Sequence, residues 1–70
     1  MVKLGIYQHY KGSEYRVIGV AKHSETEEQL VVYQPMYGDM DLWVRPLSMF
    51  IETVVSDGIE LPRFKWIRHQ

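Results

Sequence analysis

Short runs of β-branched and aromatic residues, separated about every ten positions by turn-forming residues, most strongly constrain how this chain folds. Valine, isoleucine, threonine and tyrosine dominate these runs. The pattern is typical of a small sandwich or barrel, because each short strand is followed by a turn that brings the next strand alongside it. We therefore predict a mainly β fold: a small SH3-like, partly open barrel of about five to six antiparallel strands with one short 3₁₀ turn.

The same runs define the expected elements. The second strand should be the longest, because apolar residues on both of its faces indicate a central strand, and Gly19 marks a bend or bulge in it. A proline at the start suits a single 3₁₀ turn over residues 46–50. We expect the last residues, 68–70, to fray. The predicted strands are residues 6–10, 14–22, 29–34, 42–45, 51–55 and 59–61.

A first hairpin is expected around Lys11 and Gly12, where glycine supplies the positive φ of a tight turn. If the turn holds these two residues, His9 lies opposite Glu14 on the neighbouring strand. The register then predicts a cross-strand charge pair between them.

The last hairpin carries the strongest local signal, because Asp57-Gly58 between two apolar runs matches a two-residue type I′ loop. This loop sets the register of the two strands that flank it. The expected cross-strand pairs are Ser56 with Ile59, Val54 with Leu61 and Glu52 with Arg63.

Length, charge and composition limit the function. Seventy residues make a single domain, 1–70, and almost all of the 46% apolar residues are needed for its core. A net charge of −1 gives no broad cationic face, so a general nucleic-acid binder is not expected. The absence of cysteine excludes disulfides, thiolate metal sites and a cysteine nucleophile. With no long apolar run and no secretory signal, we expect a soluble cytoplasmic protein without a membrane partner.

The best candidate for a binding surface is the pair Trp43 and Arg45. Strand alternation places these two side chains on one face and Leu42 and Val44 on the other. An exposed indole beside a guanidinium offers a stacking platform and a bidentate clamp for an anion. The alternative is that Trp43 is the main core residue, with Leu42 and Val44 facing a second layer.

The histidines are weaker candidates. His9 is followed by Tyr10 and Lys11, but neighbours on a strand point to opposite faces, so a joint site from all three is not expected. His23-Ser24-Glu25 holds the residue types of a hydrolase triad at a spacing that an extended chain cannot bring together. No ligand spacing resembles a metal site, and we expect no metal or cofactor.

Several short motifs occur in order along the chain: HYKG at 9–12, HSET at 23–26, VVY at 31–33, YG at 37–38, LWVRP at 42–46, MF at 49–50 and PRF at 62–64. Together they resemble a small bacterial domain-of-unknown-function family over nearly the whole chain. The resemblance implies a compact, mostly β, stand-alone cytoplasmic protein and no known activity or ligand. It marks these residues as ligand-binding candidates: His9, Tyr10, Lys11, His23, Glu25, Tyr33, Trp43 and Arg45.

Three functional hypotheses follow. The leading one is a non-catalytic binding module in which Trp43 and Arg45 contact a small anionic or aromatic ligand, or a protein partner. The second is a small enzyme that uses His9 or His23 as a general base, oriented by Glu14 or Glu25. The third is local nucleic-acid contact, should basic residues cluster on one face. The chain is expected to be a monomer or a homodimer.

Overall fold

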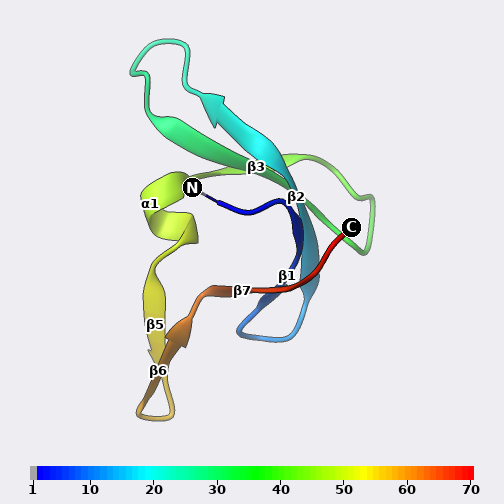
Figure 1. Ribbon diagram of the computed structural model, residues 1–70, viewed down its shortest axis with the longest axis vertical. Coiled ribbons are helices and arrows are strands. Elements are labelled where there is room, and N and C mark those ends of the chain that lie inside the picture. Colours follow the sequence, from blue (N-terminus) through cyan, green and yellow to red (C-terminus); the bar gives the residue numbers. More distant parts are fainter. Residues whose placement is uncertain (1) are drawn as a thin grey trace.

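The computed structural model describes residues 2–70 as seven strands in two antiparallel sheets with one short helix, and no closed barrel forms within that range (Figure 1). The larger sheet has the order β4-β3-β2-β1-β7, and β5 and β6 form a separate hairpin. The elements are β1 (Gly5–His9), β2 (Glu14–Lys22), β3 (Gln29–Pro35), β4 (Trp43–Pro46), α1 (Leu47–Phe50), β5 (Thr53–Ser56), β6 (Ile59–Pro62) and β7 (Phe64–Arg68).

The predicted mainly β, unclosed antiparallel fold is confirmed, with seven strands in place of about five to six. β2 is the longest strand, at nine residues, and its register shifts between Val17 and Gly19, where a bend or bulge was expected. The turn predicted at residues 46–50 is the four-residue helix α1.

The strand that the sequence analysis missed is β7, whose last residue falls in the tail that was expected to fray. β7 pairs with β1 at the other end of the chain. Gly5 makes this approach possible, because a Cβ at that position would collide with the Trp66 indole and lie 2.7 Å from the Arg68 carbonyl oxygen. The Trp66 indole N–H donates to the Leu4 carbonyl oxygen at 3.0 Å.

The β5–β6 hairpin has the predicted register. Val54 lies opposite Leu61, and Ser56 lies opposite Ile59. Asp57 and Gly58 have φ values of +54° and +77°, as a type I′ turn requires at both central positions. At the base of the hairpin, Arg63 donates from Nη2 to Oε1 of Glu52 at 2.7 Å, so the predicted Glu52–Arg63 pair is confirmed.

The predicted register of the first hairpin is wrong by one residue. Gln8, not His9, lies opposite Glu14, because three residues, Tyr10 to Gly12, connect the two strands in this register in place of two. The loop is closed by the His9 N–H, which donates to the Ser13 carbonyl oxygen at 2.8 Å. The predicted His9–Glu14 pair therefore does not form, since a one-residue slip turns every side chain to the other face. Glu14 instead accepts a hydrogen bond from Arg68 at 2.7 Å.

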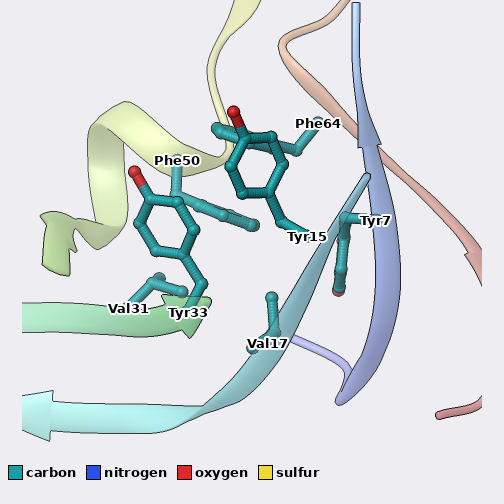
Figure 2. Packing of buried hydrophobic residues seen from close by; sticks show 7 residues of the cluster. All are labelled: Tyr7, Tyr15, Val17, Val31, Tyr33, Phe50 and Phe64. Atoms are coloured by element: carbon teal, nitrogen blue, oxygen red, sulfur yellow. The ribbon is translucent and has the colours of Figure 1, made fainter. Parts of the chain in front are cut away.

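The core lies on the inner face of the curved sheet and is mostly aromatic (Figure 2). Alternate residues of β3 are buried there, as a strand with one covered face requires. Phe50 from α1 stacks on Phe64 from β7, with ring centroids 4.2 Å apart and planes within 5°. The core residues are Tyr7, Tyr15, Val17, Val31, Tyr33, Phe50 and Phe64. Within residues 2–70, no helix has the length and hydropathy needed to cross a membrane.

Candidate ligand-binding site

Aromatic side chains and one arginine gather at one edge of the aromatic core, where Tyr37 and Trp43 are exposed to solvent and Tyr15, Tyr33 and Phe64 are buried. In Figure 2 the rings of Tyr15 and Tyr33 stand side by side, with Phe64 behind Tyr15. The ring centroids of Tyr15 and Tyr33 are 5.6 Å apart, and Phe64 lies 5.6–5.7 Å from both. We call this cluster the aromatic basin: Tyr15, Tyr33, Tyr37, Trp43, Arg45 and Phe64.

β4 contributes the two side chains that the sequence analysis ranked first. Trp43 lies opposite Tyr33, and Arg45 lies opposite Val31. The indole and the guanidinium lie on one face of β4, as predicted. Because paired residues point to the same face and the β3 partners are buried, this is the inner face of the sheet. The Trp43 ring packs 6.0 Å from that of Tyr33, yet the residue stays 43% exposed.

The alternative role for Trp43, as the main core residue, does not hold. Leu42 and Val44 are 62% and 59% exposed, so no second layer covers them. Phe50 and Phe64 occupy the centre of the core in place of the indole. Trp43 is left at the rim, where one side of its ring contacts the basin and the remainder faces solvent.

Arg45 is held by aromatic groups. Its Nε donates to the Tyr33 hydroxyl at 3.2 Å, and its Cζ lies 5.6 Å from the centroid of the Phe64 ring. Within residues 2–70 the salt bridges are Arg63–Glu52 and Arg68–Glu14, so Arg45 has no carboxylate partner there. An oriented guanidinium with unused donors is well suited to bind an anion.

Two of the three tyrosine hydroxyls of the basin are paired with each other. Those of Tyr15 and Tyr37 are 3.1 Å apart. Burial, followed by the hydrogen bond with Tyr37, raises the pKa of Tyr15 to about 12. Tyr15 is therefore uncharged at neutral pH and does not compete with a ligand for Arg45.

His9 borders the basin, with its ring 5.0 Å from that of Phe64 and 6.3 Å from that of Tyr15. Its Nδ1 accepts a hydrogen bond from the Lys11 backbone N–H at 3.1 Å. Burial lowers the pKa of His9, and the nearby charges of Arg63, Arg45 and Lys11 lower it further. The imidazole is thus neutral at pH 7, in a region rich in cations.

A hollow of about 530 Å³ is lined by His9 and by no residue of the basin. It separates the β1–β2 loop from β6 and the start of β7, which approach each other because β1 pairs with β7. We call it the lysine cleft: His9, Tyr10, Lys11, Leu61, Pro62 and Lys65. The candidate residues 9–11 thus all line this cleft. The sequence analysis did not expect a joint site from these three residues, because neighbours on a strand point to opposite faces.

His23 and Glu25 lie in the β2–β3 loop, at the far end of the molecule from the β5–β6 hairpin (Figure 1). The His23 Nδ1 accepts the backbone N–H of Glu25 at 3.1 Å and that of Thr26 at 3.3 Å. From Val17, beside the basin, to His23 is about 20 Å along β2. These two candidates are therefore not brought to the basin, and His23 acts as a turn acceptor.

The sequence analysis did not select Tyr15, Tyr37, Phe64 or Lys65 for the site. Tyr15 could have been found from its alternation with Val17, had the register of the first hairpin been right. Phe64 and Lys65 depend on the pairing of β7 with β1, which no local pattern signals. Among residues 2–70, no group of three or more His, Asp or Glu side chains is close enough to hold a metal ion.

Residues 5–66 match the model of a family described as "Protein of unknown function (DUF1653)". The chain belongs to DUF1653. It is also similar to a DUF1653 protein from Bordetella bronchiseptica, known from a crystal structure, at 35% sequence identity and a TM-score of 0.90. The likeness covers 99% of this chain and 91% of that one. No curated protein matches significantly.

Membership of DUF1653 confirms the resemblance to a domain-of-unknown-function family. The family carries no named function, and nothing in these comparisons indicates catalysis or a specific ligand. The function must therefore be argued from the geometry of the basin and the cleft.

Proposed function

We propose that this DUF1653 protein is a non-catalytic binding module whose aromatic basin takes a small ligand with a planar ring and a negative charge. The observation that carries the proposal is the environment of Arg45, a guanidinium oriented by Tyr33 and Phe64 and without a carboxylate partner in residues 2–70. The half-exposed indole of Trp43 lies on the same face of β4. A cation and a stacking surface side by side fit an aromatic anion.

In the bound state, the ligand ring stacks against Trp43 and its anionic group accepts hydrogen bonds from the free guanidinium donors of Arg45. Tyr33 holds the guanidinium in place, so little side-chain entropy is lost on binding. Ring stacking contributes about 1 kcal/mol and a charge-assisted contact about 3 kcal/mol. Together they amount to about 4 kcal/mol before the entropic cost of association, so a ligand that binds tightly has to use additional surface.

The alternative of a histidine-dependent enzyme required Glu14 or Glu25 to orient the base. Glu14 is paired with Arg68, and Glu25 contacts His23 only through its backbone N–H. These two predicted carboxylate–histidine pairs are wrong, which favours the binding module.

The same basin would accept an aromatic or acidic side chain of a protein partner. We place the protein in the cytoplasm, supported by its cysteine-free composition, and propose that it is a monomer or a homodimer.

The test is a titration followed by ¹H–¹⁵N NMR, with indole-3-carboxylate as the probe and uncharged indole as its comparison. We expect indole-3-carboxylate to shift the Trp43 indole N–H resonance and to bind at least tenfold more tightly than indole. Arg45→Gln should remove that preference, while Lys22→Gln, at the exposed end of β2, should keep it. Equal binding of the two probes, or an unchanged preference in Arg45→Gln, would overturn the proposal.

Trp43→Ala is a less clean variant. It removes the stacking surface, but the indole also packs 6.0 Å from the rings of Tyr15 and Tyr33. We therefore expect it to lose binding and also to lower the melting temperature, whereas Arg45→Gln should affect mainly the binding.

A further inference from the structure

We propose that the lysine cleft is a second, separate binding site and that it takes a small phosphate monoester with an apolar body. This site goes beyond the proposed function, because no residue of the aromatic basin lines the cleft. The pairing of β1 with β7 separates the two sites. His9 and Phe64 turn to the inner face of the sheet, whereas the next pair, Gln8 and Lys65, turns to the outer face. The cleft therefore has a ligand of its own.

Backbone hydrogen bonds join the two walls of the cleft. The Tyr10 N–H donates to the Arg63 carbonyl oxygen at 3.0 Å, which extends the β1–β7 ladder into the β1–β2 loop. Within that loop, the Gly12 N–H donates to the His9 carbonyl oxygen at 2.7 Å. The Gln8 side-chain amide donates to the Gly12 carbonyl oxygen at 3.2 Å. The loop is thus shaped before a ligand arrives, which reduces the entropy lost on binding.

The lining of the cleft is cationic. Lys11 comes from the β1–β2 loop and Lys65 from β7, and among the described residues neither Asp nor Glu lines the cleft. Neither lysine takes part in the ion pairs that the structure shows within residues 2–70. Glu14 lies opposite Gln8, but its carboxylate already accepts a hydrogen bond from Arg68 at 2.7 Å. Charge complementarity therefore selects an anionic occupant.

The charge and the size of the cleft define the class of ligand. Two separate ammonium groups suit a phosphate monoester, which carries about 1.5–2 negative charges at pH 7, better than a planar carboxylate with one. At about 530 Å³ the cleft has the size of an ordinary small-molecule site, so inorganic phosphate alone would leave much of it empty. Tyr10, Leu61 and Pro62 supply apolar surface for the rest of the ligand. A small organic phosphate meets both requirements.

The experiment titrates cyclohexyl phosphate, cyclohexanecarboxylate and inorganic phosphate at low salt, followed by the backbone N–H resonances of Lys11, Gly12 and Lys65 in ¹H–¹⁵N NMR. These probes have no planar ring to stack in the basin. We expect cyclohexyl phosphate to bind at least tenfold more tightly than either of the others. Lys11→Gln and Lys65→Gln should each weaken it about tenfold. Lys22→Gln removes the same charge at the far end of β2 and should leave binding within about twofold.

The inference is overturned if cyclohexyl phosphate does not shift the resonances of the cleft, or if cyclohexanecarboxylate or inorganic phosphate binds as tightly. It is also overturned if Lys22→Gln weakens binding as much as the cleft variants do. Arg45→Gln should leave the binding of cyclohexyl phosphate within about twofold, and a tenfold loss in that variant would overturn the separation of the two sites. The proposed function of the basin is decided by its own titration with indole-3-carboxylate, so the two proposals can fail independently.

Discussion

Replacing Gly5 with alanine tests how the final strand is attached to the first. Gly5 has φ +141°, a region in which a residue with a side chain loses about 1–3 kcal/mol. The new methyl group would collide with the Trp66 indole, which would have to move and give up its hydrogen bond to the Leu4 carbonyl, at about 1 kcal/mol. The combined loss is about 3 kcal/mol, a large part of the stability of so small a domain.

For a chain of 70 residues, this loss lowers the melting temperature by about 12–24 °C. Thermal unfolding followed by circular dichroism measures it directly. Gly19→Ala is the matched control, because Gly19 is also in the sheet but has no neighbour within 4 Å of an added Cβ. Its free energy of unfolding should change by less than about 1 kcal/mol. If the two variants melt within about 4 °C of each other, the close packing of Trp66 on Gly5 does not hold β7 in place.

Two further predictions concern charge. Glu52→Gln should lower the free energy of unfolding by about 1 kcal/mol, because it weakens a partly buried ion pair with Arg63. Glu14→Gln should lower it by less, because the ion pair with Arg68 is more exposed. Chemical denaturation measures both free energies of unfolding. In the folded chain the pKa of His9 lies below its ordinary value of 6.5. As the pH falls, His9 is therefore protonated in the unfolded chain before it is protonated in the folded chain. The free energy of unfolding should therefore fall as the pH drops below about 6.5. His9→Asn keeps an acceptor for the Lys11 N–H and should reduce this pH dependence, measured by urea unfolding at several pH values. An unchanged pH dependence would contradict the role given to His9.

Local patterns were sufficient where a few adjacent residues decide the structure. Asp57-Gly58 sets both positive φ values of its turn, and the register of the flanking strands then follows without help from the rest of the chain. Alternation likewise placed Trp43 and Arg45 on one face. The predicted register of the first hairpin failed because Gly12 is compatible with loops of different length, and the sequence does not indicate whether two or three residues form the turn.

The amino-acid sequence by itself determined the mainly β class, the long second strand, the final hairpin and the two side chains that β4 presents to its inner face, because each depends on neighbours within a few residues. The tertiary structure alone decided that β7 pairs with β1, that Phe64 rather than Trp43 fills the centre of the core, and that Lys11 and Lys65 face one cleft. The strand pairing and the cleft join residues more than 50 positions apart, and Phe64 packs on Tyr15 and Tyr33 from distant strands. They are selected by the burial of aromatic surface in the complete fold, which no short segment of the chain can show.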